Sequence, residues 1–156
     1  MNTMQEENFN TTGSLRVIIS NEFGEVTKEF SVTNLVVNTG KNWITARLKD
    51  GGPAQMSLMG IGTETTTIGA DPVVVGDTAL GTPLGAQVAL TTAGGVVTNN
   101  VIEYQATFPA NGTYVGAITE AGIFNAAATM LCRTKFLAVN KAATDTMTIV
   151  WTVTAS

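Results

Sequence analysis

Alternating apolar and polar positions recur along most of the chain and predict β-strands. The clearest run is Asp145–Thr154, in which every second residue is apolar and most of the others are threonines. Its apolar members are Met147, Ile149, Trp151 and Val153. A period of two is typical of a strand that buries one face and exposes the other. The run therefore predicts a half-buried strand with a threonine-lined outer face.

Shorter runs of the same kind predict further strands, separated by turn-forming residues. Leu15–Ser20 and Val26–Thr33 flank the turn sequence Asn21–Gly24 and together predict a β-hairpin. The remaining strands are predicted at Ser57–Ile61, Gly85–Thr91, Val101–Phe108, Ala117–Phe124 and Met130–Val139. About seven or eight short strands separated by turns predict a mainly β protein with an antiparallel β-sandwich fold.

The segment from Thr39 to Gly51 has the periodicity of a short α-helix instead. Four of its residues recur at a spacing of three or four, which places them on one helix face. Thr39 is the predicted N-cap, and Gly51–Pro53 is predicted to end the helix. The pattern predicts a helix of about ten residues. The residues of the shared face are Trp43, Ile44, Arg47 and Leu48.

The start of the chain follows neither pattern. It is polar and acidic, so it has little apolar surface to bury. We expect residues 1–13 to form a flexible N-terminal arm and residues 14–156 to form a single β-sandwich domain. An arm that becomes ordered on a neighbouring molecule adds contact area without enlarging the fold. The residues of the arm that we expect to bind a partner are Met1, Met4 and Phe9.

Composition and charge narrow the range of partners. The 156 residues carry a net charge of −4, and only 13% of them are charged, about half of the ordinary share of about 25%. No basic face is apparent, so we expect no nucleic-acid binding. No apolar run approaches the roughly 20 residues that a membrane-spanning helix requires. Met1–Asn10 has no apolar signal-peptide core. We therefore expect a soluble protein that binds no membrane.

The sequence contains few groups that catalysis uses. Histidine is absent, which removes the commonest general base and the commonest neutral metal ligand. Cys132 is the one cysteine, so neither an intrachain disulfide nor a cysteine-rich zinc site can form. We interpret the loop carboxylates Glu64, Asp71 and Asp77 as solvated groups or turn caps. We predict no enzyme activity, no catalytic residue, no metal and no cofactor. A hydrolase that uses two carboxylates remains an alternative.

Glu120 is the charge that stands out, because it lies within an apolar stretch. A buried carboxylate needs a partner, and Arg133 on a nearby predicted strand is the candidate. We interpret Glu120 and Arg133 as a structural or interface ion pair, not as catalytic groups. Trp43 and Trp151 are interpreted as packing residues, not as a ligand platform. Cys132 is interpreted as a buried residue.

Four parts of the chain are distinctive as a set: Phe30–Asp50, Met56–Thr63 with Gly76–Thr82, Ile118–Asn125, and Met130–Thr134 with the strand Asp145–Thr154. In their order and spacing these parts resemble one family of small virion structural proteins of tailed bacteriophages. The third part, Ile118–Asn125, also resembles a motif of tail-fibre and tail-collar proteins. The chain departs from the family pattern in the loop after Gly62, which carries extra residues at 65–69 and 73–75.

The resemblance implies a non-enzymatic component of a phage particle, assembled in the cytoplasm of the bacterial host. The first placement is a head decoration or cement protein that bridges subunits of the major capsid protein. A homo-oligomer is then expected, and a trimer is one of the closed symmetric forms. The alternative placement is the tail, as an adaptor or the base of a fibre. A carbohydrate-binding β-sandwich is a third hypothesis, which the aromatic content of 6% disfavours.

Overall fold

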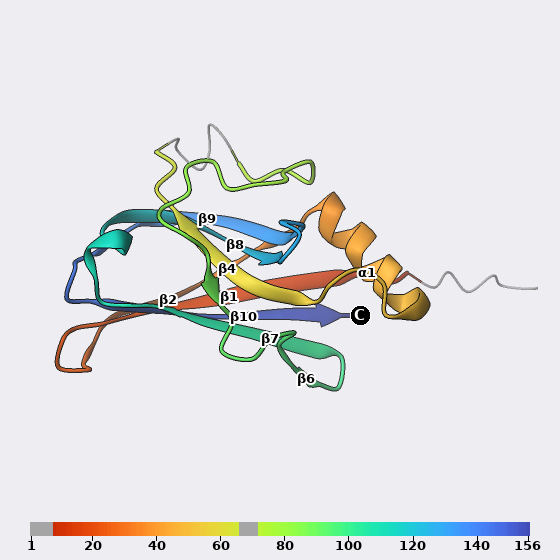
Figure 1. Cartoon of the computed structure of the whole chain (residues 1–156), viewed down its shortest axis with the longest axis horizontal. Coiled ribbons are helices and arrows are strands. Elements are labelled where there is room, and N and C mark those ends of the chain that lie inside the picture. Colours follow the sequence, from red (N-terminus) through yellow and green to blue (C-terminus); the bar gives the residue numbers. More distant parts are fainter. Residues whose placement is uncertain (1–7, 66–71) are drawn as a thin grey trace, which may run out of the picture.

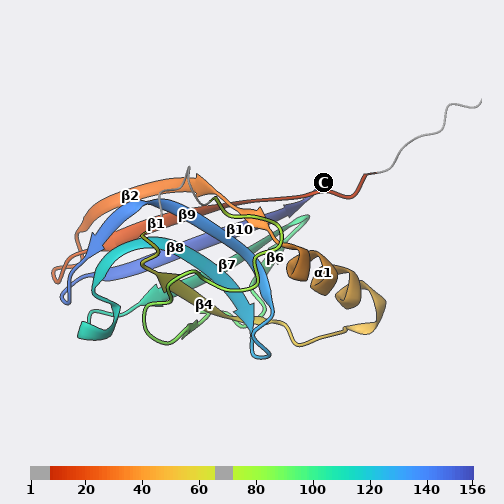
Figure 2. The same ribbon diagram turned by 90° about the horizontal axis from the view of Figure 1, so that it is seen from above.

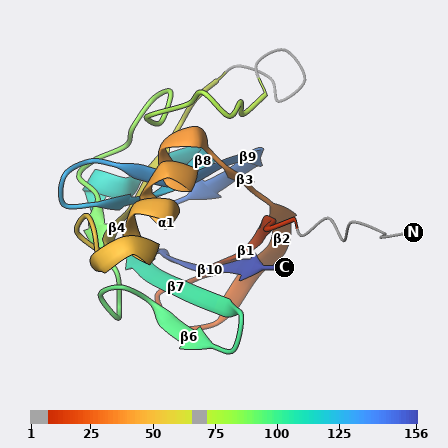
Figure 3. The same ribbon diagram turned by 90° about the vertical axis from the view of Figure 1, so that its right-hand side faces the viewer.

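The computed structural model describes residues 8–65 and 72–156 and confirms the predicted mainly β fold with one helix. Two antiparallel sheets pack face to face (Figure 1), and a single apolar core fills the space between them. Seen from above, the long strands of both sheets follow the long axis of the molecule (Figure 2). Helix α1 (Asn38–Asp50) lies across the end of the sandwich at which the C-terminus is found (Figure 3).

The first sheet is built around the strand that the sequence pattern predicts most clearly. On the inner face of that strand Met147, Ile149 and Trp151 are fully buried, because each lies between neighbouring strands and under the second sheet. The alternation predicted for this strand is therefore confirmed. In spatial order the strands are β2 (Val26–Thr33), β1 (Thr11–Ser20), β10 (Thr146–Ala155), β7 (Val101–Phe108) and β6 (Val96–Thr98).

The second sheet is covered on both faces along its central strands. One face packs on the core, and the loop that precedes Pro83 crosses the other face (Figure 1). Leu80 from this loop packs in a small cluster with Phe124 and Met130. Residues of two central strands are therefore buried without alternation. In spatial order the strands are β3 (Leu35–Val36), β9 (Met130–Lys141), β8 (Gly116–Asn125), β4 (Met56–Gly62) and β5 (Val88–Ala89).

Helix α1 begins and packs differently from the sequence prediction. Its N-cap is Val37 and not Thr39, whose hydroxyl instead donates to the Met130 carbonyl at 2.8 Å. The helix has 13 residues and ends where Gly51 adopts a left-handed φ of 79°, as predicted. Gly40 lies against the backbone of Leu131, leaving no space for a Cβ atom. Among the described residues, no helix has the length and apolar character needed to cross a membrane.

Several predicted boundaries are wrong. Residues 11–13 belong to β1 and not to an arm, because they pair with the end of β10, and Asn10 exchanges two backbone hydrogen bonds with Ser156. The strand predicted at Gly85–Thr91 is reduced to β5, because only Val88 and Ala89 pair with β4. Strands β3 and β6 were not predicted. These short strands have too few residues to show a period.

Candidate functional site

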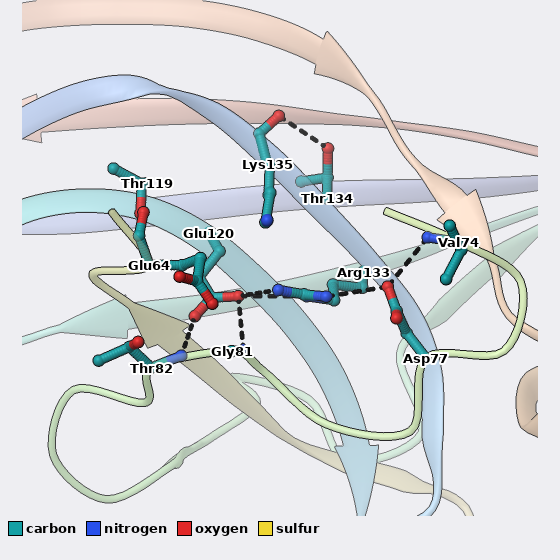
Figure 4. A network of polar contacts seen from close by, with 10 residues as sticks. All are labelled: Glu64, Val74, Asp77, Gly81, Thr82, Thr119, Glu120, Arg133, Thr134 and Lys135. Atoms are coloured by element: carbon teal, nitrogen blue, oxygen red, sulfur yellow. Dashed lines mark hydrogen bonds and ion pairs between the residues drawn. The ribbon is translucent and has the colours of Figure 1, made fainter. Parts of the chain in front are cut away.

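A buried polar network joins the second sheet to the loop that crosses it (Figure 4). Glu120 comes from the middle of β8 and Arg133 from the adjacent strand β9. The side chain of Glu120 is 0% exposed and that of Arg133 is 7% exposed. The structure thus brings together the two residues that the sequence paired.

Both oxygens of the Glu120 carboxylate accept hydrogen bonds. The carboxylate accepts hydrogen bonds from Arg133 Nε at 3.1 Å and Nη2 at 2.7 Å, and from the backbone amides of Gly81 at 3.0 Å and Thr82 at 2.8 Å. Three of these donors bind Oε2, and the Thr82 amide binds Oε1. A buried carboxylate is tolerated when it is paired and its lone pairs are filled in this way.

Arg133 makes a second ion pair that the sequence did not indicate. Its Nη1 donates to Asp77 Oδ2 at 2.8 Å, and the same oxygen accepts the Val74 amide at 3.0 Å. Burial alone lowers the pKa of the Arg133 guanidinium, but the hydrogen bonds and charges of Glu120 and Asp77 outweigh burial and raise this pKa above its ordinary value. The guanidinium therefore stays charged and holds both carboxylates.

The network fixes the loop onto the sheet at two points. Asp77 attaches the later half of the loop to Arg133, and the Gly81 and Thr82 amides attach its end to Glu120. The end of the loop lies close to β4 and β8. A Cβ atom on Gly62 of β4 would overlap both the Glu120 carboxylate and the Thr82 carbonyl. Between these points Leu80 packs on the small apolar cluster. Together these contacts form a latch: Glu120, Arg133, Asp77 and the amides of Gly81 and Thr82.

The loop carboxylates that the sequence analysis interprets as solvated groups or turn caps lie in different surroundings. Asp77 caps a turn, as interpreted, but it is not solvated: its side chain is 18% exposed and pairs with Arg133. Glu64 is partly buried, and its carbonyl accepts a hydrogen bond from Thr119 at 2.8 Å. Asp71 lies outside the described residues. The second partner of Arg133 could have been expected from the sequence. A guanidinium has five N–H donors, and one carboxylate cannot satisfy all of them in a buried strand.

The end of the sandwich under α1 holds an apolar pocket of about 270 Å³. Phe9, the one described member of the predicted partner-binding residues, lines this pocket and is 68% exposed. Met1 and Met4 lie outside the described residues. Trp43 also lines the pocket, and its indole N–H donates to the Ala54 carbonyl at 2.8 Å. Trp43 thus packs partly on the core while Trp151 is fully buried. The pocket had no signature in the sequence.

The arrangement around Glu120 is suited to holding a loop, and not to moving a proton, because both carboxylate oxygens already accept hydrogen bonds and solvent does not reach them. Cys132 is fully buried, and burial raises the pKa of its thiol well above the ordinary value. Within the described ranges, no group of three or more acidic or cysteine side chains is placed to hold a metal ion. Comparisons of the chain with protein-family models, curated proteins and solved structures find no match.

Proposed function

We propose that this chain is a non-enzymatic structural protein of a tailed-bacteriophage particle, and that it decorates the capsid by bridging subunits of the major capsid protein. The proposal starts from the resemblance of four parts of the sequence to small virion proteins. Three of these parts supply the latch: Gly76–Thr82, Ile118–Asn125 and Met130–Thr134. The resembling residues thus serve one structural unit, as a shared fold requires.

The observation that carries the proposal is the outer face of the first sheet. Hydroxyl side chains are frequent on this face along β1 and β10, and some of them meet directly in pairs. Ser14 and Thr152 lie 3.1 Å apart through their hydroxyl oxygens, and Thr107 and Thr148 lie 3.0 Å apart. A hydroxyl costs far less to remove from water than a charged group does. A broad face of this kind is suited to a large contact with a neighbouring subunit.

The charged groups of this face are sparse. Arg16 and Glu29 pair with each other at 3.3 Å, and Glu103 lies two strands away on β7. Charged residues are depleted at the centres of protein interfaces, because burying an unpaired charge is costly. The face therefore favours contact with another protein over exposure as an ordinary solvated surface.

The tail is the second placement that a specific observation supports. Ile118–Asn125 resembles a motif of tail-fibre and tail-collar proteins. In this chain Glu120–Asn125 is buried within β8, so the motif serves packing and does not offer a contact surface. We therefore rank capsid decoration above a tail adaptor or fibre base. The carbohydrate-binding hypothesis has less support, because the exposed aromatic residues Phe9 and Phe23 lie at opposite ends of β1.

Purified particles of the virus that encodes the chain provide the test. Quantitative gel staining gives its copy number relative to the major capsid protein, and cryo-electron microscopy locates it. Capsid decoration predicts a copy number comparable with that of the capsid protein and density over the whole lattice. Density confined to the tail at low copy number would transfer the proposal to the tail. Absence from particles would overturn both placements.

A surface variant tests directly whether the hydroxyl-rich outer face of the first sheet is a contact surface. Replacing Thr148 and Thr152 with lysine puts two charges at the centre of the hydroxyl face without touching the core. This double variant should fold but lose incorporation into particles. The matched control is Thr144→Lys, in the exposed turn before β10, which should be incorporated normally. Equal incorporation of the two variants would show that this face is not the contact surface.

A further inference from the structure

The pocket under α1 is open and largely apolar. Its walls come from helix α1, from strands of the first sheet and from Leu131 of β9. Figure 3 shows that α1 covers this end of the sandwich. A smaller hollow of about 210 Å³ adjoins it and shares Phe9, Thr11 and Ile44 with it. Apolar side chains that line an unfilled pocket lack packing partners on one side. The apolar side chains that line the main pocket include Phe9, Trp43, Ile44, Val97 and Ile102.

We propose that this pocket binds the N-terminal segment of a second copy of the chain, with the side chain of Met4 entering it. Seven residues precede the described part of the chain, and Met4 is the apolar residue at their centre. A methionine side chain is unbranched and flexible, so it fits an irregular pocket well. The proposal stands on the pocket and on the segment before Asn8, and it does not depend on where in a particle the protein lies.

The geometry of Asn10 favours a second copy over the same chain. Two backbone hydrogen bonds to Ser156, at 2.7 and 2.8 Å, align Asn10 with the end of the sheet. Phe9, the next residue outward, already lines the pocket of its own chain. Met4 could enter that same pocket only if the chain reversed within the four residues between them. Of those four residues only Asn8 is of a type that favours tight turns, and glycine and proline are absent from residues 1–8. A second copy has no such constraint.

Charge complementarity supports the same occupant. Glu6 and Glu7 follow Met4 by two and three residues. An extended chain advances about 3.3 Å per residue, so these carboxylates would lie within about 10 Å of the bound methionine. Lys41 of α1 lines the adjoining hollow and is exposed. The apolar residue and the acidic pair of the segment thus match the apolar pocket and the basic residue beside it.

Disulfide trapping between two different full-length variants tests the proposal. One chain carries Met4→Cys and the other carries Val97→Cys, at a pocket residue that is 66% exposed. The native Cys132 is fully buried and will not compete. The two chains differ in size through a tag, are mixed under mild oxidation, and are separated on a non-reducing gel. The expected product is a disulfide-linked heterodimer.

The controls separate the competing occupants. Phe23→Cys lies in the turn at the far end of β1 and is 79% exposed, so it should not crosslink to Met4→Cys. A bond that forms within the Met4→Cys/Val97→Cys double variant but never between chains would overturn the proposal in favour of the chain's own segment. No crosslink, or equal crosslinking to Phe23→Cys, would also overturn it. Each of these results leaves the particle proposal to its own test.

Sedimentation velocity supplies a second measurement without engineered cysteines. Met4→Ala removes most of the side chain that enters the pocket and should weaken self-association by roughly tenfold. Asn2→Ala is the matched control in the same segment and should leave self-association unchanged. If Met4→Ala associates as strongly as the wild-type chain, Met4 does not occupy the pocket.

Discussion

Replacing Glu120 with glutamine should destabilise the protein far more than the small change in structure would indicate. The Glu120 carboxylate accepts hydrogen bonds from four N–H groups. Glutamine offers one carbonyl oxygen and one NH2 group, which is itself a donor. Whichever way its amide is turned, the NH2 group faces at least one donor. In the better orientation it faces the Thr82 amide, and in the other it faces Arg133 and Gly81.

The size of the effect follows from these contacts. A buried donor that loses its acceptor costs about 1–3 kcal/mol, and breaking a buried ion pair by removing one partner costs about 3–5 kcal/mol. Both ranges include the cost of leaving a buried partner unpaired, so the two values are not added. Arg133 keeps its bond to Asp77 at 2.8 Å, which favours the lower end. We expect Glu120→Gln to lower the free energy of unfolding by about 3 kcal/mol, against a typical total of about 5–15 kcal/mol.

Urea denaturation followed by tryptophan fluorescence measures this change, because Trp151 is fully buried in the core. Glu29→Gln is the matched control: its partner Arg16 is 52% exposed, and pairs of that kind contribute less than about 1 kcal/mol. Hydrogen exchange adds a local readout. In Glu120→Gln the Thr82 amide should exchange faster, while amides of β1 keep their order of protection. Equal destabilisation by the two glutamine variants would refute the reasoning.

Three further predictions concern other parts of the fold. Gly40→Ala should destabilise by about 1–3 kcal/mol in denaturant unfolding because a Cβ would overlap the Leu131 backbone; a gain of about 1 kcal/mol, as helix propensity alone predicts, would contradict this packing. Burial raises the pKa of both the Cys132 thiol and the Tyr104 phenol. Both groups therefore contribute fully to stability below the unfolded thiol pKa of about 8.5. As the pH rises, the contribution of the thiol is lost above about 8.5 and that of the phenol above about 10. Denaturation at stepped pH should show that Cys132→Ala loses less unfolding free energy with rising pH than the wild-type chain does. At a concentration low enough to keep the chain monomeric, deleting residues 1–7 should leave the melting temperature unchanged, since pairing with β10 begins at Thr11. The deletion should weaken co-sedimentation with particles; undiminished binding would show that the segment is not an anchor.

The parts of the fold that the sequence predicts are those in which one face is buried and the other is not. β10 and β7 alternate clearly, because each packs on the core on one side alone. The Glu120–Arg133 pair was predictable for a related reason, since a charge within an apolar stretch must find a partner nearby. These two residues lie diagonally across adjacent strands, with Glu120 opposite Lys135 and Arg133 opposite Gly122, and 13 positions separate them in the chain. Local pattern and local pairing were sufficient in both cases.

The parts that the sequence did not predict depend on long-range contacts. Asp77 reaches Arg133 across 56 positions, and Thr39 binds the Met130 carbonyl across 91. Thr39 is a good N-cap residue by type, but the approach of α1 to β9 gives its hydroxyl another acceptor. In the same way residues 11–13 are polar and resemble an arm, yet backbone pairing with β10 holds them in the sheet. Backbone hydrogen bonds leave no mark in side-chain patterns.

The position of the latch decides where the function of this protein should be sought. Strands β8 and β9 and the loop before Pro83 meet at Glu120 and Arg133, both buried beneath that loop. Residues in such a place determine how the second sheet is built, and a partner cannot touch them. The surfaces that could distinguish a capsid from a tail placement lie elsewhere, on the hydroxyl face of the first sheet and at the pocket beside Phe9. Variants at the latch will therefore change stability, and variants at those two surfaces will change what the protein binds.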